Sequence, residues 1–261
     1  MIAYEQSFEC DELDVSFPAP PYNANYDSTK KFQDLRFHLM KLYSQRSHPM
    51  ETLLHPANYT TDVCDFRLSF LLLQQLETLG YRHCSDLCKA KIYTSFAEQL
   101  ENYNLWQWSI YILLHIPNQA QRELTIQQLL YRHIRNDGDY EDQTYPEKEK
   151  FIVDSLNISV NWIYWAKAVR AGATNNFHVQ AKYLLKAKQW SAAHEIIMKH
   201  IAPDAIINDN FPYLKSLLEQ FEVVQEISNW STQGQILVHF MELNEKVSKI
   251  EVTLSYSLVI N

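Results

Sequence analysis

Leu105-Trp-Gln-Trp-Ser-Ile-Tyr-Ile-Leu-Leu-His-Ile116 is the stretch of sequence that decides the fold. On a helix its apolar residues, at spacings of three and four, line three different faces. A helix that is apolar nearly all round must be covered by other protein on most of its surface. The stretch is too short to span a bilayer, so the rest of the chain has to supply the covering. It therefore predicts a central helix in a stack of helices.

The composition favours an ordered, all-helical protein. The chain has 261 residues, 46% of them hydrophobic and 13% aromatic, which is unlike the composition of disordered proteins. It has only four glycines, and no two lie close together, so P-loop and dinucleotide-binding folds are excluded. The net charge of −8 argues against a nucleic-acid surface, which needs a basic footprint.

The sequence also indicates a compartment. Four cysteines in a chain of this length are no disulfide framework, and the first ten residues contain no apolar signal-peptide segment. The longest apolar runs fall far short of a membrane span. We therefore expect a soluble protein of a reducing compartment, either the cytosol or the nucleus.

Turn signals divide the chain into five parts. Residues 1–27 read as an acidic, proline-containing extended arm, whose Pro18 and Pro21 have PxxP spacing but are more typical of a stiff linker. Residues 28–135 form a helical trunk portion, and residues 136–145 an acidic loop. Residues 146–245 form a helical tail portion, and residues 246–261 are β-branched and weakly helical.

A quasi-repeat refines the fold class. Trp108-Ser109 opens one helix and Trp190-Ser191 another, each after a helix rich in alanine and leucine. A tryptophan just past a tight turn, followed by small residues, is typical of stacked helical hairpins. The spacing is too irregular for a tetratricopeptide array. The sequence therefore predicts an all-α, irregular α-solenoid of stacked helical hairpins.

Candidate metal ligands are incomplete. His194-Glu195 resembles the start of a helical zinc-protease motif, but Met198 stands where the second histidine should be, and His200 lies on another helix face. His83, Cys84 and Cys88 form a cluster without a second ligand pair, which favours buried free cysteines over a zinc site. We expect no metal ion and no cofactor.

Candidate catalytic and nucleic-acid residues are equally unsupported. Four histidines lie in apolar helical stretches and are expected to be core or flank residues: His38, His115, His178 and His200. Trp162, Tyr164 and Trp165, with Lys167 and Arg170 nearby, have the composition of a base-stacking platform, although aromatic residues at helical spacing are core far more often. No catalytic residue is predicted, and we expect no enzyme.

Several motifs, in their order along the chain, resemble the C-terminal part of the nuclear protein ninety-six family of scaffold nucleoporins. They are Leu35-Arg-Phe-His-Leu-Met-Lys-Leu-Tyr-Ser44, Asp65-Phe-Arg-Leu-Ser69, the stretch 105–116, Trp162 with Ala166-Lys-Ala-Val-Arg-Ala171, and Asp204-Ala-Ile-Ile-Asn208 with Tyr213-Leu-Lys215. The resemblance covers roughly residues 30–230. It implies a coatomer-like helical element, of which this chain would form part of the return trunk and the tail.

The resemblance implies a structural subunit of the Y-shaped coat of the nuclear pore complex, which supports pore assembly and nucleocytoplasmic transport. Its expected place is the nucleus, at the nuclear envelope, where it coats the membrane without spanning it. Its expected partners are other Y-complex scaffold nucleoporins, especially the hub subunits, with no small molecule and no nucleic acid bound directly. Which residues bind those partners stays unknown at this level.

Two features of the family do not occur in this sequence. One is the β-rich segment that completes the open propeller of the WD-repeat partner, and the other is the autoproteolytic His-Phe-Ser junction. This argues against binding of that propeller through a donated blade. The missing features also predict that the crown, the region with which the family docks on the adjacent scaffold subunit, is incomplete in this chain. Residues after Glu245 depart from the family pattern, so the last contacts of the tail are not expected from the resemblance.

Two other classes of function remain as alternatives. A vesicle-coat or membrane-tethering subunit would use the same helical element, although the Trp-Ser repeat and the motif at 204–208 favour the nucleoporin. An RNA-binding helical repeat, motivated by the aromatic residues around Trp162, predicts RNA binding that weakens as salt rises.

Overall fold

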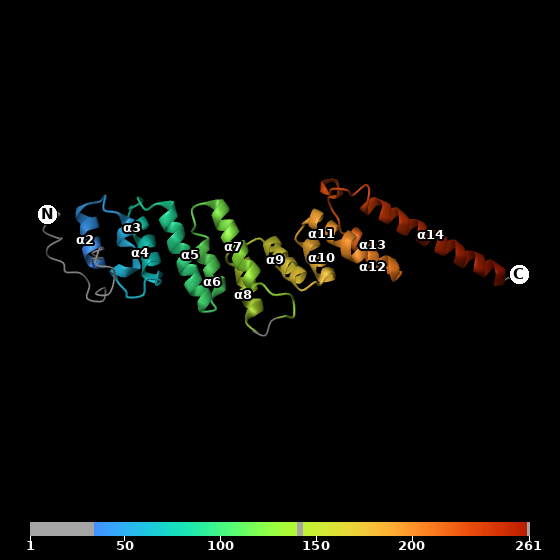
Figure 1. The fold of residues 1–261 in the computed structure, drawn as a ribbon, viewed down its shortest axis with the longest axis horizontal. Helices are drawn as coiled ribbons and strands as arrows, with labels where there is room; N and C mark the ends of the chain where they lie inside the picture. The colour runs from blue at the N-terminus through green and yellow to red at the C-terminus, as the bar shows by residue number, and fades with distance from the viewer. Residues whose placement is uncertain (1–33, 140–142, 260–261) are drawn as a thin grey trace. The chain divides into compact units, whose positions relative to one another are not determined.

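The computed structural model describes residues 34–139 and 143–259, and this part of the chain contains helices and turns but no strand (Figure 1). The all-α prediction is confirmed for these residues, whereas the stacking of hairpins into a solenoid stays a prediction. The predicted arm, residues 1–27, lies outside the described residues. The chain divides into two compact units, residues 1–126 and 127–261, with the division inside one helix, α7.

The first unit is built from short helices that pack on their neighbours in sequence. They are α2 (Leu35–Ser44), α3 (Met50–Leu53), the 3-10 turn η2 (Pro56–Asn58), α4 (Arg67–Thr78), α5 (Asp86–Asn102), α6 (Trp106–Leu113) and the start of α7 (Gln119–His133). The packed pairs are α2 with α3, α4 with α5, and α5 with α6. Leu73, Ile110 and Ile116 are fully buried in this unit.

The second unit begins with the end of α7, and its helices also pack mainly on their neighbours in sequence. Its further elements are α8 (Tyr145–Asp154), α9 (Val160–Ala173), α10 (Phe177–Lys186), α11 (Trp190–Ile196), the π-turn η3 (Ile197–Ile201), α12 (Ala202–Ile207), α13 (Phe211–Leu218), the 3-10 turn η4 (Val224–Glu226) and α14 (Gly234–Val259). α10 packs between α9 and α11, and α13 packs on α12 and α14. Ala168, Ala181, Ala193 and Leu214 lie at the centre of its core, where the small side chains let helices approach closely.

The central stretch is covered on most but not all of its surface. Ile110 and Ile116 are fully buried, and the buried Ser109 hydroxyl donates to the Ala97 carbonyl of α5 at 2.8 Å. Trp108 and Tyr111 are 46% and 40% exposed and pack edge to face on one another. The prediction of covering is therefore right for the faces toward α5 and the core and wrong for the face of Trp108.

One backbone motif ends five helices and explains how the chain turns with so little glycine. The second residue after the last helical residue has a positive φ, between 52° and 92°, in the left-handed region. The N–H of the next residue donates to the carbonyl five positions earlier, at 2.8 to 3.0 Å, and satisfies one of the free helical carbonyls. The five left-handed residues are Gly80, Asn104, Asn175, Lys188 and Asp209.

Four of these turns are followed by a helix whose first residue is aromatic. Trp106, Phe177, Trp190 and Phe211 each begin a helix two residues after the left-handed position. The quasi-repeat is therefore real in the backbone, but the residue equivalent to Trp190 is Trp106 rather than Trp108. Three residues on, Ser109 and Ala193 are both fully buried, which places the small residue of the repeat against the preceding helix.

The structure moves several predicted helix ends. The glycine at position 172 predicts a helix end there, but α9 continues to Ala173. Gly172 instead lies at a close approach of α10, where a Cβ would come within 2.6 Å of the Gln180 side-chain nitrogen. The apolar spacing of residues 63–79 predicts one helix, but α4 begins only at Arg67, after Asp62 and Asp65 have accepted turn N–H groups from Cys64 and Arg67.

The C-terminal part differs more. The apolar spacing of residues 211–227 predicts a single helix, but α13 ends at Leu218 and is followed by the separate turn η4. The segment predicted to be weakly helical, residues 246–261, continues α14 as far as Val259. α8 begins at Tyr145 with Pro146 in its first turn, and the division into trunk and tail portions stays a prediction.

Lys188 offers a test of the turn motif. A Cβ in the left-handed region costs about 1 kcal/mol, which glycine avoids. We expect Lys188→Gly to be more stable to urea unfolding than Lys188→Ala by about 1 kcal/mol, because both lose the exposed Lys188–Glu222 ion pair but only alanine keeps the Cβ. Equal stability of the two variants would show that the left-handed turn at position 188 carries no strain.

Candidate functional site

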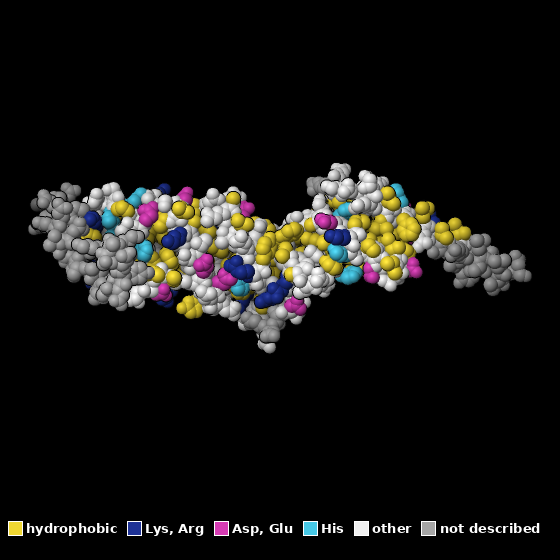
Figure 2. Space-filling model, viewed as in Figure 1, with side chains coloured by type: hydrophobic (Ala, Val, Ile, Leu, Met, Phe, Trp, Pro, Cys, Tyr) yellow, Lys and Arg dark blue, Asp and Glu magenta, His cyan; other side chains and the backbone are white. Residues whose placement is uncertain are grey.

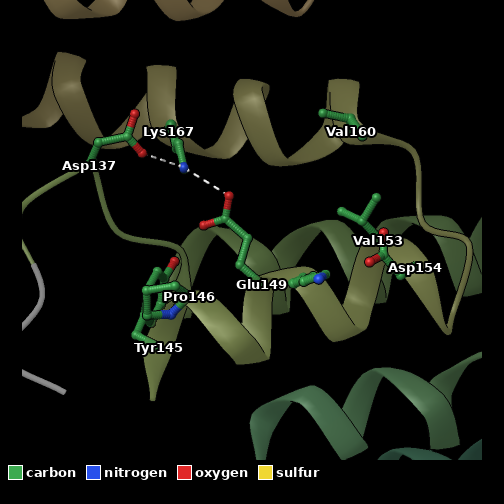
Figure 3. A pocket seen from close by; sticks show the side chains of 9 residues that line it. Asp137, Tyr145, Pro146, Glu149, Val153, Asp154, Val160 and Lys167 are labelled. Carbon is green, nitrogen blue, oxygen red and sulfur yellow. Dashed lines mark hydrogen bonds and ion pairs between the residues drawn. The ribbon is translucent and has the colours of Figure 1, made fainter. Parts of the chain in front are cut away.

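The most polar buried site surrounds Lys167 of α9 (Figure 3). The lysine is 5% exposed, and its Nζ donates to Asp137 Oδ1 at 2.7 Å and to Glu149 Oε1 of α8 at 2.9 Å. The ammonium also lies 5.8 Å from the centre of the Tyr183 ring on α10. One side chain thus joins α8, α9, α10 and the segment that follows α7.

The protonation states of this site are fixed. Burial by itself would lower the pKa of Lys167, but the hydrogen bonds to Asp137 and Glu149 outweigh it and raise the pKa above its ordinary value. The hydrogen bond from Lys167 holds the pKa of Asp137 below its usual range. Burial raises the pKa of Tyr145 to about 12, and the Tyr145 hydroxyl accepts the Arg135 N–H at 2.7 Å. These shifts move all three groups away from neutrality, so they supply neither a general acid nor a general base there.

A pocket of about 370 Å³ opens beside Lys167. Its lining comes from α8, α9 and the segment before α8: Asp137, Tyr145, Pro146, Glu149, Lys150, Val153, Asp154, Val160 and Lys167. Among the lining residues, Lys167 forms ion pairs with Asp137 and Glu149. The arrangement is a structural junction rather than a ligand site.

The aromatic residues proposed as a base-stacking platform pack within the second unit instead. Trp165 Nε1 donates to the Tyr131 hydroxyl at 2.7 Å, and the Tyr164 ring stacks on Tyr183 with centroids 6.2 Å apart. Trp162 is half-buried, and Lys167 is held by its carboxylates. Lys167 is therefore unavailable to a nucleic acid, whereas Arg170, the other cation of the RNA hypothesis, is half-buried on α9.

The histidines of the zinc-protease-like motif lie apart. His194 is 4% exposed between the rings of Phe221 and Trp230, and burial lowers its pKa. His200 stacks on Phe177 with centroids 3.7 Å apart. Across residues 34–139 and 143–259, no three His, Cys, Asp or Glu side chains converge as metal ligands.

The other candidates have structural partners. Cys84 is buried and Cys88 half-buried, and the hydrogen bond between the two thiols raises the pKa of Cys84 and lowers that of Cys88. His83 Nε2 bonds to the His48 carbonyl at 2.8 Å rather than joining the cysteines as a ligand.

The remaining histidines are also satisfied. His38 Nδ1 and His48 Nε2 share a buried hydrogen bond of 3.0 Å, so His38 is a core residue. His115 Nδ1 bonds to the Tyr111 carbonyl at 3.0 Å, and His178 Nδ1 to the Tyr213 hydroxyl at 3.0 Å. These contacts agree with the interpretation of these residues as core and flank histidines.

A second hollow, which the sequence did not indicate, lies between α13 and α14. It has a volume of about 440 Å³ and is lined by Phe211, Pro212, Lys215, Met241, Asn244 and Glu245. Figure 2 shows apolar side chains gathered over this region and along the first part of α14. No motif in the sequence signals this hollow, because its lining comes from two helices whose packing on one another the sequence does not specify.

Large apolar side chains are exposed on other helices as well. The most exposed are Tyr43, Leu79, Leu87, Tyr103 and Ile207, each between 69% and 86% exposed. They are scattered over different elements, and single exposed apolar residues are normal on a protein surface. None of the described helices combines the length and the hydropathy that a membrane span requires.

Comparison with known proteins gives the family. Residues 1–170 match the family model of nuclear protein 96 (Nup96). The chain is 48% identical over 253 residues to the nuclear pore complex protein Nup98-Nup96 of Drosophila melanogaster, covering 95% of this chain and 13% of that protein. It is 32% identical over 260 residues to the protein of the same name from Dictyostelium discoideum, covering 92% and 12%.

A further relative comes from plants. The nuclear pore complex protein NUP96 of Arabidopsis thaliana is 24% identical over 230 residues, covering 85% of this chain and 21% of that protein. The chain thus spans between 12% and 21% of the length of these three relatives. Since the family model matches more than half of its residues, the chain belongs to the nuclear protein 96 family.

Proposed function

We propose that the chain is a non-enzymatic structural scaffold segment of the nuclear pore complex. The observation that carries the proposal is the similarity over 95% of the chain to a nuclear pore complex protein. Two features of the described residues support it. The charged side chains of Lys167, Asp137 and Glu149 are engaged with one another, and apolar side chains gather over α13 and the first part of α14 (Figure 2), as on a surface that docks another subunit.

The finer part of the proposal concerns its partners. The chain contributes to the Y-shaped coat by docking helices on other scaffold nucleoporins, especially those at the hub, and lies at the nuclear envelope. The motifs at 35–44, 65–69 and 204–208 support this assignment through their resemblance to the family. The vesicle-coat alternative has no comparable support, since the three relatives described above are all named as nuclear pore proteins.

A segment exchange tests the proposal. The aligned stretch of the Drosophila protein is replaced by this chain, fused to a fluorescent protein, in cells depleted of their own copy. We expect the hybrid to concentrate at the nuclear rim and to restore the number of pores. A hybrid carrying Ile110→Asp, which puts a charge into the core of the first unit, serves as the control and is expected to fail.

The outcomes separate the alternatives. A hybrid that reaches normal levels but stays away from the rim would reject the scaffold proposal. Accumulation on vesicle membranes would favour the vesicle-coat function. Salt-sensitive RNA binding by the purified chain would revive the RNA hypothesis, although Lys167 is buried in its ion pairs.

A further inference from the structure

The helix α14 carries a continuous apolar stripe that is about half exposed along its length, although one member, Phe240, also packs edge to face on Phe211 of α13, with ring centroids 5.9 Å apart. The stripe consists of Ile236, Phe240, Leu243, Val247 and Ile250, and each side chain is between 47% and 61% exposed. Their spacing alternates between four and three residues, which is the heptad repeat of a coiled-coil seam. Leu254 continues the same register along the helix. This stripe is called the α14 seam below.

The α14 seam is distinct from the face that holds the helix to its own unit. Leu237, Val238 and Met241 pack into the core of the second unit, and Met241 is only 5% exposed. At 100° per residue, this packing face lies roughly 140° around the helix from the seam. The ion pair between Lys215 of α13 and Glu245, at 3.2 Å, holds the helix on the packing side. A second helix on the seam would therefore pack beside α13 at Phe240 and extend along Leu243, Val247 and Ile250.

The residues beside the α14 seam specify which helix fits. With Phe240 and Val247 at a positions and Leu243 and Ile250 at d positions, Lys246 occupies a g position and Glu251 the following e position. In a parallel two-stranded coiled coil, a g position of one helix neighbours the e position of the next heptad on the other. Two copies of α14 would therefore pair Lys246 with position 251, a glutamate, on both sides of the seam.

We propose that the α14 seam is a self-association site, at which two copies of this chain form a parallel two-stranded coiled coil. Val247 at an a position and Leu243 at a d position are the residue types that favour two strands, whereas Ile236 and Ile250 at the other d positions are not, so the pairing of Lys246 with Glu251 carries the choice of two parallel copies. An antiparallel pair of fully overlapping seams would instead place Lys246 opposite its own copy, which like charge disfavours. The inference goes beyond the scaffold function, because it assigns a partner that is the chain itself.

Sedimentation equilibrium of the purified full chain tests the site. We expect the mass to rise from 30.8 kDa toward twice that value between about 1 and 100 μM. Val247→Lys, which puts a charge into the seam, is expected to weaken the dimer more than about tenfold. Glu242→Lys adds the same side chain to α14 outside the seam and is the matched control, expected to leave the dimer intact. Circular dichroism of each variant checks that the helices persist.

A charge exchange tests the parallel register. Lys246→Glu places like charges beside the seam and is expected to weaken the dimer about fivefold, whereas Lys246→Glu with Glu251→Lys restores it. A chain that stays monomeric at the highest concentration overturns the proposal. A dimer that Val247→Lys leaves intact also overturns it, because the contact would then lie elsewhere. Failure of the double exchange to restore affinity rejects the parallel arrangement.

Discussion

Ile110→Ala is expected to lower the free energy of unfolding of the first unit by about 3 kcal/mol. The side chain is fully buried in α6, at the centre of the stretch that organises this unit. Its truncation removes the burial of three methyl or methylene groups and leaves a cavity that α5 and α6 cannot close, because Ser109 ties the two helices together through the Ala97 carbonyl. Urea unfolding followed by circular dichroism measures the loss.

Leu124→Ala is the matched control for that prediction. Leu124 lies on α7 in the same unit and is 56% exposed, so its truncation leaves no buried cavity. We expect a change within about 0.5 kcal/mol, since alanine also has the higher helix propensity. If both variants lower the free energy of unfolding by the same amount, then Ile110 does not lie in the interior of the unit.

Lys167→Met is expected to destabilise the second unit by about 2 kcal/mol. Methionine fills nearly the same space but offers no donor, so Glu149 and Asp137 lose their shared partner while remaining close together. The loss is smaller than for a fully enclosed ion pair, because the Asp137 side chain is 65% exposed and regains water. Lys150→Met, at an exposed position on the same pocket, is the control and is expected to have little effect.

The stability difference between the wild type and Lys167→Met should depend on pH in a way that follows from the pKa shifts of Asp137 and Lys167. The lowered pKa of Asp137 means that its contribution is present above the ordinary aspartate pKa and is lost as pH falls through the folded value. The raised pKa of Lys167 means that its contribution is present below the ordinary lysine pKa and is lost only as pH rises through the folded value. The wild type should therefore keep a constant advantage over Lys167→Met near neutral pH, and this advantage should shrink under acid conditions. An advantage that grows on acidification would contradict the ion pair.

A double-mutant cycle identifies the partner. Glu149→Gln is expected to be costly in the wild type and nearly neutral in the Lys167→Met background, because the two side chains act on one hydrogen bond. Additive losses would mean that Lys167 stabilises the unit through packing alone.

The sequence predicted the existence of the helices better than their ends. Periodic apolar positions located α5, α6, α9 and α10, because the burial of one face depends on spacing within the helix itself. The ends depended on backbone geometry that composition hides. Glycine commonly ends a helix, but Gly172 instead allows a close contact with α10. The left-handed turn that follows α9 is made by Asn175, which has a side chain and is therefore harder to recognise from sequence.

The role of Lys167 could not be derived from its neighbours in sequence. Beside Trp162 and Arg170 it reads as part of a basic, aromatic surface, but its partners lie 30 and 18 residues earlier in the chain. Only the packing of α8 against α9 brings Glu149 to it. The same limit applies to the α14 seam, since the helical period shows an apolar stripe and only the structure shows that the unit leaves it uncovered.

The closely packed helix pairs described above are mostly neighbours along the chain, and this has a consequence for how the protein forms. The three-residue loops between α5 and α6, α9 and α10, and α10 and α11 close quickly and at little entropic cost, so the contacts they create form early in folding. A growing chain that emerges from the ribosome can complete each hairpin before the next one is made. We expect shortened chains that end just after Asn104 or Asn175 to retain helical structure in their earlier hairpins.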